Sequence, residues 1–385
     1  MSAPPTALST LVARFDPEVF DLGRPHARLR LAVEGSGEWD VVLSDGAARL
    51  GEPAGDRPDA TLSADGATWD RLAADLRGGM DAFRAGRLRV RHDLHLGVGF
   101  LAATAGVPED GGLRFRHVET DAGRISLMEA GHGAPVVMLH GLGATKASFL
   151  PTLAALANEE RRAIAIDLPG FGDSDKPLAA TYDARFFARS VVALLDALDI
   201  ERADAIGNSM GGRVAIELGL RHPGRVRRLA LLAPSLAWLR ERRWAKVLRF
   251  VPPQLGALQP APRPLVEAIV RRSIPGREDG WTAAGVDEFL RSYLEPRGRA
   301  AFYAAARNIY LEEPHGPGGF WTRLPELQPP SLFVWGRRDP LVPLAFARHV
   351  RVALPQARHL ELDCGHVPQL ERPRETHGRI ASFLS

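Results

Sequence analysis

Residues 203–220 read ADAIGNSMGGRVAIELGL, in which a short apolar run is followed by a glycine-rich turn and a helical pattern. The run at 203–206 predicts a buried strand, and the apolar spacing at 214–220 predicts a helix. Between them lies G-x-S-x-G, whose small residues allow a tight turn that projects the Ser209 hydroxyl above a sheet. The helix N-terminus favours negative charge that develops there. We therefore predict that Ser209 is a nucleophile rather than a serine that only caps a helix.

Similar apolar runs recur along the second part of the chain and alternate with helical patterns. These runs occupy residues 136–139, 163–166, 229–232, 332–335 and 360–362. Continuous apolar strands between helices are typical of a parallel sheet that is covered on both faces. The alternation breaks between Ser235 and Pro330, a stretch rich in Trp and Pro. We predict an α/β fold with a mostly parallel, doubly wound sheet and a helical cap inserted at residues 236–328.

The N-terminal part of the chain follows a different pattern. Leu29, Leu31 and Val33 alternate with less apolar residues, as in a half-buried strand, and a second run at 39–43 leads into an Asp-Gly turn. Three- and four-residue steps then place a set of apolar residues on one helical face. This set comprises Trp69, Leu72, Leu76, Met80 and Phe83. We expect a small α+β domain at 12–105 and, after a linker at 104–112, a second domain at 113–385.

Length and composition limit the remaining possibilities. At 385 residues the chain is long for one domain of about 100 to 200 residues. The net charge is only +3 and acidic and basic residues interleave, so nucleic acid is not an expected partner. The single cysteine, Cys364, excludes an intrachain disulfide and a Cys-based zinc cluster, and it points to a reducing cytoplasm. We expect neither an export signal nor a membrane span, since no apolar run approaches about 18 residues.

A serine nucleophile needs a histidine base and a group that orients this base. Asp339 follows the strand predicted at 332–335, and His366 follows the strand predicted at 360–362. Both should lie at the carboxyl edge of the sheet, where Ser209 also lies and where open α/β sheets bind ligands. The order Ser, Asp, His supports this set. Asp363 is a weaker second candidate for the acid, and the strand at 229–232 is followed by no acid.

Acyl transfer also needs hydrogen-bond donors for an oxyanion. His140-Gly141-Leu142-Gly143 follows an apolar run, so the backbone N–H groups of Leu142 and Met210 are the predicted donors. We expect His140 to be structural and Cys364 to be a core thiol. His92 and His95 are expected to be solvated rather than metal ligands. No metal or cofactor is predicted.

Together, these motifs resemble the α/β-hydrolase family over residues 113–385. The matching segments are HGLG at 140–143, DLPGFGDSDKP at 167–177, GNSMGG at 207–212, WGRRDPLVP at 335–343 and GHVPQLERP at 365–373. In that family the same triad serves esterases, lipases, carbon–carbon bond hydrolases and cofactor-free haloperoxidases. Dehalogenases and epoxide hydrolases carry Asp at the nucleophile position, so Ser209 argues against both.

The GNSMGG motif at 207–212 is similar to the corresponding motif of hydrolases acting on ring-cleavage products. Their longer oxyanion loop, with its Gly-Pro and Asn, is not matched by HGLGATKASF at 140–149. The sequence therefore favours a serine hydrolase of a hydrophobic carboxylic ester. A carbon–carbon bond hydrolase or a cofactor-free haloperoxidase is the alternative within the fold.

The N-terminal part resembles the sterol-carrier-protein type 2 family. The resemblance is carried by DATLSADGATWDRLAADL at 59–76 and MDAFRAGRLRVRHDLHL at 80–96. It implies a fold that encloses an apolar tunnel for lipids, whereas a small domain with an ordinary core is the alternative. His92-Asp93 departs from the Gly-Asp that family members often show. A lipid-binding or transfer protein with a vestigial hydrolase domain is accordingly a further alternative for the whole chain.

One stretch of the predicted cap is amphipathic. Trp244, Val247, Leu248 and Val251 share a helical face opposite Arg242, Lys246 and Arg249. A cap helix over the active site is the favoured interpretation, and peripheral membrane contact is the alternative. The expected partner is a hydrophobic small molecule or lipid.

Overall fold

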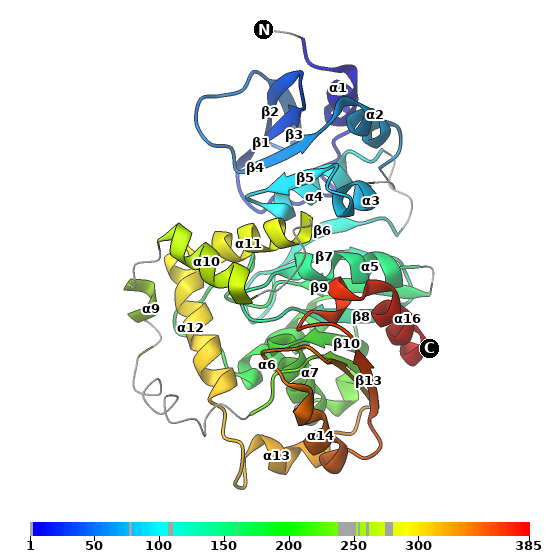
Figure 1. The fold of residues 1–385 in the computed structure, drawn as a ribbon, viewed down its shortest axis with the longest axis vertical. Helices are drawn as coiled ribbons and strands as arrows, with labels where there is room; N and C mark the ends of the chain where they lie inside the picture. The colour runs from blue at the N-terminus through cyan, green and yellow to red at the C-terminus, as the bar shows by residue number, and fades with distance from the viewer. Residues whose placement is uncertain are drawn as a thin grey trace. The chain divides into compact units, whose positions relative to one another are not determined.

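The computed structural model of the chain describes residues 3–76, 79–106, 111–158, 160–237, 252, 255–258, 262–273 and 280–385. The chain divides into two compact units (Figure 1). The first comprises residues 1–117 and 264–291, and the second comprises residues 118–263 and 292–385. Part of the insertion predicted at 236–328 therefore belongs to the first unit.

A five-stranded sheet in the order β3-β2-β1-β4-β5 forms the centre of the first unit. Its strands are β1 (His26–Val33), β2 (Gly37–Ser44), β3 (Ala47–Gly51), β4 (Ala60–Ala64) and β5 (Arg89–Arg91). β1 pairs antiparallel with β2 and parallel with β4. Leu29, Leu31 and Val33 are buried on one face of β1, which confirms the predicted period-two strand.

The single helix predicted through residues 69–83 is wrong, because the structure has two helices there. The helices of the N-terminal segment are α1 (Thr6–Ala13), α2 (Gly66–Ala74), α3 (Gly79–Arg84) and α4 (Leu94–Ala103). Asp75 ends α2 in an extended conformation with φ −153°. Helix α3 then begins at Gly79. Trp69 and Phe83 are nevertheless both buried.

Helix α11 (Gly280–Tyr293) contributes buried carboxylates to the first unit. Asp287 accepts hydrogen bonds from Arg91 Nε at 2.6 Å and from the backbone N–H of His92 at 2.9 Å. Glu288 accepts one from the N–H of Leu94, the first residue of α4, at 2.7 Å. A carboxylate at a helix N-terminus satisfies a donor that has no partner within the helix. These bonds fix α11 against the end of β5 and the start of α4.

The second unit is built on an eight-stranded sheet in the order β13-β12-β11-β10-β8-β9-β7-β6. Its strands are β6 (Arg114–Val118), β7 (Ile125–Ala130), β8 (Ala134–Leu139), β9 (Arg161–Ile166), β10 (Ala203–Asn208), β11 (Val226–Leu232), β12 (Ser331–Gly336) and β13 (Arg358–Leu362). Strands β8 to β13 pair in parallel, and β7 pairs antiparallel with β9. Every predicted apolar run forms one of these strands, which confirms the predicted fold class.

Helices pack on this sheet in two groups. One group is α5 (Leu150–Leu156), α15 (Pro368–Glu371) and α16 (Pro373–Leu384), and the other contains α6 (Ala184–Ala197) and α7 (Met210–Arg221). The stripe predicted on α6 is buried at Phe187, Val191 and Leu194. α7 contacts β8, β10 and β11, so it crosses the middle of the sheet. The start of α7 is therefore held close to the carboxyl ends of the central strands.

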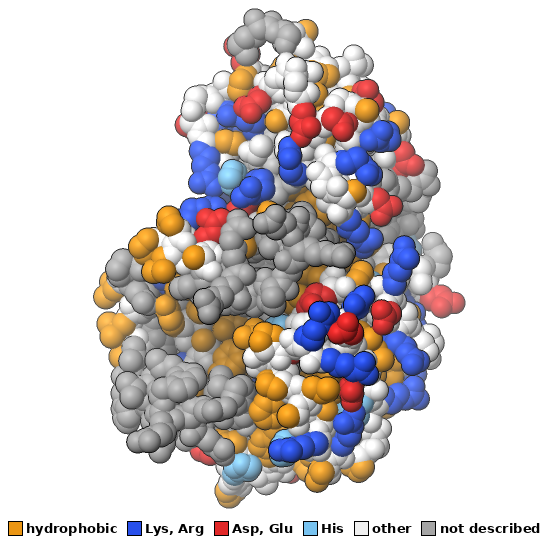
Figure 2. Space-filling model, in the orientation of Figure 1, with side chains coloured by type: hydrophobic (Ala, Val, Ile, Leu, Met, Phe, Trp, Pro, Cys, Tyr) orange, Lys and Arg blue, Asp and Glu red, His pale blue; other side chains and the backbone are white. Residues whose placement is uncertain are grey.

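The described residues between β11 and β12 form helices and turns. The helices are α9 (Leu255–Leu258), α10 (Arg263–Ser273), α11, α12 (Pro296–Tyr310) and α13 (Phe320–Arg323), and α14 (Ala347–Ala353) follows β12. The amphipathic stretch at 242–251 lies outside the described residues. None of the described helices is long and apolar enough to cross a membrane. On the face shown in Figure 2, basic and acidic side chains are interleaved. Arg338–Asp363 and Arg351–Glu361 are ion pairs of partly exposed side chains in the second unit.

We predict that Asp287→Ala destabilises the first unit by about 1 to 3 kcal/mol, because Arg91 and the N–H of His92 lose a buried acceptor. Amide hydrogen exchange should accelerate in α4 and α11. Asp81→Ala is the matched control, since Asp81 is exposed and lies 3.8 Å from Arg84 in the same unit. Equal exchange rates in the two variants would contradict the anchoring role of Asp287.

Candidate active site

The turn between β10 and α7 has a strained backbone at its centre. Ser209 has φ 53° and ψ −115°, a left-handed conformation that is uncommon for a residue with a side chain. A Cβ atom on Gly211 would lie 1.9 Å from the carbonyl oxygen of Leu139, and one on Gly207 would lie 2.3 Å from the carbonyl oxygen of Gly211. Only glycine fits at these positions. The G-x-S-x-G spacing is therefore a steric requirement of the turn.

Backbone hydrogen bonds hold Ser209 in this conformation. Its N–H donates to the carbonyl of Leu232 at 2.9 Å, and its carbonyl accepts from the N–H of Ser235 at 2.9 Å. The Ser209 hydroxyl lies 3.3 Å from the hydroxyl of Ser235, and both residues are buried. Among the described residues, this hydroxyl has Ser235 rather than His366 as its hydrogen-bond partner. The sequence analysis did not single out Ser235. Its position three residues after the predicted strand at 229–232 places it at the same edge of the sheet as Ser209.

Asp339 and His366 come together as the sequence predicts. The Nδ1 atom of His366 lies 2.7 Å from Oδ2 of Asp339, whose side chain is fully buried. The other carboxylate oxygen accepts from the N–H groups of Leu341 at 2.8 Å and Val342 at 2.9 Å. Because a carboxylate only accepts hydrogen bonds, the imidazole proton lies on Nδ1. The neutral ring of His366 then carries no proton on Nε2.

Two side chains that the sequence analysis did not single out position the loop of His366. Asn208, next to the nucleophile, donates to the carbonyl of Leu232 at 3.0 Å and to that of His366 at 3.1 Å. Glu371 accepts from the N–H of Gly365 at 2.7 Å and from that of Val367 at 3.0 Å. In the sequence, Asn208 stands out only as the asparagine of GNSMGG, and Glu371 only as the glutamate of GHVPQLERP. Together they tie the histidine loop to the serine turn.

The HGLG segment passes close to the serine turn. A Cβ atom on Gly141 would lie 3.4 Å from Ser209 Cβ. Met210 is the first residue of α7, so its N–H has no acceptor within the helix. Among the described residues, neither this N–H nor that of Leu142 donates to an acceptor of the chain. Both predicted oxyanion donors therefore remain available to a ligand.

His140 has both ring nitrogens engaged. Its Nε2 accepts from the N–H of Leu168 at 3.0 Å, so Nδ1 carries the proton and donates to the carbonyl of Gly141 at 2.8 Å. Burial lowers the pKa of His140, which keeps the ring neutral. These contacts fit the structural role expected for this histidine.

A buried ion pair anchors the other end of the HGLG loop. Lys146 Nζ lies 2.6 Å from Asp167 Oδ2, and the Lys146 N–H donates to Asp167 Oδ1 at 2.7 Å. Burial opposes ionisation of Asp167, but the Lys146 ammonium outweighs it and lowers the pKa of this carboxyl. Asp167 also accepts from the N–H of Asp173 at 2.9 Å. The pair fixes the loop that carries Leu142.

The other sequence candidates lie in different surroundings. The Asp363 side chain is 61% exposed and pairs with Arg338 at 2.9 Å. Cys364 is buried, and burial raises the pKa of its thiol to about 12, so it is a poor nucleophile. The expectation that His95 is solvated is wrong, because its ring is buried against Phe20 and Phe115. No group of His, Cys, Asp and Glu side chains among the described residues could hold a metal ion.

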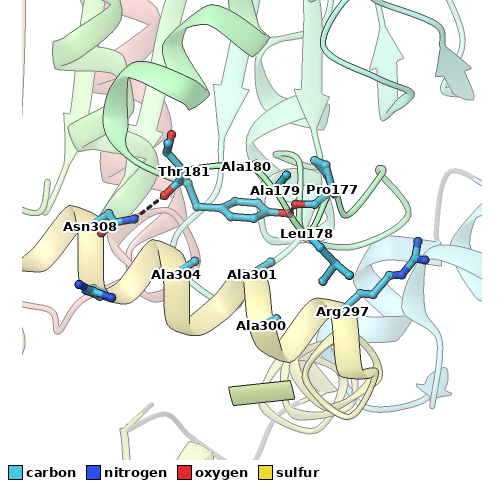
Figure 3. Close-up of a pocket in the computed structure, with 12 residues that line it drawn as sticks. Pro177, Leu178, Ala179, Ala180, Thr181, Arg297, Ala300, Ala301, Ala304 and Asn308 are labelled. Atoms are coloured by element: carbon cyan, nitrogen blue, oxygen red, sulfur yellow. Dashed lines mark hydrogen bonds between the residues drawn. The ribbon is translucent and has the colours of Figure 1, made fainter. Parts of the chain in front are cut away.

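A pocket of about 360 Å³ lies between the loop at 177–182 and α12 (Figure 3). The hydroxyl of Tyr182 donates to the carbonyl of Pro177 at 2.9 Å, and the Asn308 amide donates to the carbonyl of Thr181. Alanines of α12 line one side of it, at Ala300, Ala301 and Ala304. The lining does not include Ser209, Asp339 or His366. This pocket marks where α12 rests on the loop after β9, and it is separate from the serine turn.

Comparisons with known proteins match both parts of the chain. Residues 134–373 match the family described as alpha/beta hydrolase fold, and residues 21–101 match the SCP-2 sterol transfer family. A 2-hydroxymuconate semialdehyde hydrolase of Pseudomonas sp. strain CF600 is 29% identical over 68% of this chain and 90% of its own.

Solved structures show the same fold. An enol-lactonase from Burkholderia xenovorans LB400 superposes with a TM-score of 0.58, at 24% identity, over 70% of this chain and 99% of its own. A membrane phospholipase A, described as a bacterial virulence factor, superposes with a TM-score of 0.56, at 28% identity, over 71% of this chain and 86% of its own. The residues that match the hydrolase family, 134–373, include Ser209, Asp339 and His366.

The helix that follows the serine is held by a buried ionic network. Arg213 Nε donates to Glu312 at 2.6 Å, and Arg213 Nη2 donates to Glu217 at 2.7 Å. Arg323 Nη1 donates to Glu217 at 3.1 Å. Burial alone would raise the pKa of the Glu217 carboxyl, but Arg213, with Arg221 and Arg323, lowers this pKa to about 2. The network joins α7 to the segment between α12 and β12.

We predict that Glu217→Gln lowers stability at pH 7 by about 3 to 5 kcal/mol, because it leaves buried Arg213 short of a charge partner. The folded-state pKa lies below the ordinary value of about 4.3, so the contribution is present above that pH and is lost as the pH falls towards 2. Urea unfolding of both proteins at pH 7, 5 and 3 should show a converging difference. Glu361→Gln, at a partly exposed pair with Arg351, should change stability by at most about 1 kcal/mol. A difference that does not vary with pH would contradict the ionic assignment.

Proposed function

Because the chain belongs to the alpha/beta hydrolase fold family, we propose that it is a serine hydrolase in which Ser209 is the nucleophile, His366 the base and Asp339 the group that orients His366. The observation that carries this proposal is the 2.7 Å bond between the His366 ring and the buried Asp339 carboxylate. That bond fixes the tautomer with an unprotonated Nε2, and Asn208 ties the same loop to the serine turn. For the transfer, the hydrogen of the Ser209 hydroxyl turns to His366 while Ser209 Oγ stays beside Ser235.

The reaction proceeds in two acyl transfers. Ser209 Oγ bonds to the substrate carbonyl carbon as its proton passes to His366 Nε2. The carbonyl oxygen becomes an oxyanion that accepts from the N–H groups of Leu142 and Met210. The bond to the leaving group breaks as His366 returns the proton to that group. Water then attacks the acyl-enzyme, with His366 again acting first as base and then as acid, and Ser209 is released with its proton.

The proposed substrate is a hydrophobic carboxylic ester. The phospholipase A structure supports ester cleavage, and the short HGLGATKASF loop departs from that of ring-cleavage hydrolases. A carbon–carbon bond hydrolase is the second candidate, because several curated relatives are hydrolases of that kind. In both cases a carbonyl carbon is attacked and an oxyanion forms, so the same residues would serve. A cofactor-free haloperoxidase of the same fold remains the third candidate.

The first unit is proposed to hold an apolar substrate for the second. Its match to the SCP-2 sterol transfer family supports this role. A cavity of about 380 Å³ in this unit is lined by the apolar residues Phe15, Phe20, Leu22 and Leu43, together with the charged residues Asp21, Arg24 and Asp45. Holding the substrate on the same chain raises its effective concentration at Ser209 without any new chemistry.

A fluorophosphonate probe should label the protein, and Ser209→Ala should abolish labelling without unfolding it, because the probe reacts with an activated serine. Ser331→Ala is the matched control, since Ser331 is also buried and bonds to the carbonyl of Pro329. Mass spectrometry of the labelled peptide identifies the serine. Retained labelling of folded Ser209→Ala protein would refute the nucleophile.

Asp339→Asn should lower kcat by about 10³ to 10⁴, because the amide cannot hold the imidazole in the required tautomer or stabilise its charge. Asp363→Asn is the control, and exposed Asp363 should change kcat by less than about twofold. Steady-state kinetics on an aryl ester measure both. A larger loss in Asp363→Asn would reverse the order of the two candidates.

A chain-length series of aryl esters should show kcat/KM rising with acyl length, and 2-hydroxymuconate semialdehyde should be cleaved much more slowly than the best ester. Faster cleavage of 2-hydroxymuconate semialdehyde than of the best ester would favour the carbon–carbon hydrolase.

Leu22→Glu, which places a charge in the cavity of the first unit, should reduce kcat/KM for long esters about tenfold and leave short esters unchanged. Binding of a fluorescent fatty acid to Ser209→Ala protein checks the same cavity. Unchanged kcat/KM for long esters in Leu22→Glu would exclude substrate delivery by the first unit.

A further inference from the structure

Ser235 contacts the nucleophile through both its backbone and its hydroxyl. Its N–H donates to the carbonyl of Ser209 at 2.9 Å, and its Oγ lies 3.3 Å from Ser209 Oγ. Ser209 is 4% exposed and Ser235 is 2% exposed, so water competes little with this contact. The pair is therefore a buried hydroxyl–hydroxyl contact at the reacting atom.

The chain before Ser235 is held in one conformation by close packing. Ala233 is fully buried with φ 43°, and its N–H donates to the carbonyl of Val334 in the neighbouring strand at 2.8 Å. Pro234 lies so close to α7 that a Cβ atom on Gly212 would approach its Cβ to 2.8 Å. A left-handed alanine is strained by about 1 to 3 kcal/mol and persists only where the surroundings enforce it. The turn thus places the Ser235 hydroxyl at a fixed point beside Ser209.

Other buried serines of the second unit use their hydroxyls differently. Ser174 donates to the carbonyl of Asp167, and Ser190 donates to the carbonyl of Phe186. Among the described residues, the Ser235 hydroxyl has Ser209 Oγ as its partner. The partner of the Ser235 hydroxyl is thus another hydroxyl, whereas Ser174 and Ser190 donate to backbone carbonyls.

The chemistry of Ser209 determines the direction of this hydrogen bond. During attack, Ser209 gives its proton to His366, so its oxygen can only accept from Ser235. Negative charge develops on Ser209 Oγ as the proton leaves, and it develops there again when the acyl bond breaks and before His366 returns the proton. A hydroxyl donor to a charged oxygen forms a stronger bond than one to a neutral oxygen. The contact is therefore more favourable in the transition states than at rest.

We propose that Ser235 is a catalytic residue that donates its hydroxyl hydrogen to Ser209 Oγ, orienting it towards His366 and stabilising its charge in both acyl transfers. This inference rests on the proposed function, in which Ser209 is the nucleophile. It involves no further bond to substrate, since the proton of Ser235 stays on its own oxygen throughout.

The test compares Ser235→Ala with Ser190→Ala in the full chain. Ser235→Ala keeps the backbone N–H that holds Ser209 and removes only the hydroxyl. We expect the second-order rate of fluorophosphonate labelling and the kcat for a short aryl ester each to fall about 3- to 10-fold, with KM within about twofold of wild type. Ser190→Ala should leave both rates unchanged. Ser235→Cys, which keeps a weaker donor in a similar volume, should give intermediate rates.

Each outcome bears on one claim. Wild-type labelling and kcat in folded Ser235→Ala protein would overturn the role of Ser235 and leave that of Ser209 intact. A loss in Ser235→Ala that Ser235→Cys does not partly restore would also overturn it, since packing rather than donation would then be responsible. If Ser235→Ala fails to fold, the rates of Ser235→Cys decide alone: a reduced kcat at unchanged KM supports donation, and wild-type rates refute it. Absence of labelling in the wild-type protein would instead refute the proposed function.

Discussion

The left-handed backbone of Ser209 is the constraint on which the second unit depends. A residue with a side chain adopts φ 53° only if its neighbours leave room and its hydrogen bonds enforce it. Room comes from Gly207 and Gly211, where any side chain would collide with backbone atoms. The hydrogen bonds are made with Leu232, the last residue of β11, and with Ser235, three residues further on. This turn holds the serine hydroxyl above the carboxyl edge of the sheet. The loops after β8, β12 and β13 begin at the same edge.

The remaining site is a set of loops tied to that turn. Asn208 links it to the carbonyl of His366, and Glu371 holds the backbone on either side of the histidine. A buried carboxylate, Asp339, then fixes the ring. Because the Asn208 amide and the Asp339 carboxylate are buried and would be costly to leave unpaired, the loops have one well-determined arrangement. Preorganisation of this kind is what the proposed proton transfer between Ser209 and His366 requires.

The division into two units does not follow the order of the sequence. Residues 264–291 lie inside the hydrolase part of the chain but belong to the first unit. Asp287 and Glu288 explain why, since they supply acceptors for the end of β5 and the start of α4. Residues 264–291 thus belong to the same unit as the segment that matches the SCP-2 sterol transfer family. The parts of the chain that match the two families are therefore not independent modules.

The sequence by itself determined the parallel sheet, the serine turn, and the pairing of Asp339 with His366. Apolar runs of strand length between helical patterns leave few other folds, and G-x-S-x-G at a strand–helix junction meets a steric requirement that is local. It could not separate α2 from α3, because their apolar residues share one helical spacing across the break at Asp75.

Only the tertiary structure decided which residues from distant segments meet. The contact of Ser235 with Ser209 depends on the register of β10 against β11, and the pairing of Asp287 with Arg91 spans 196 positions. Burial of His95 between Phe20 and Phe115 likewise depends on how separate segments pack. Such contacts are long-range, so no periodicity or motif within one segment records them. They arise because packing brings groups from separate segments within contact distance, about 3 Å for a donor and its acceptor.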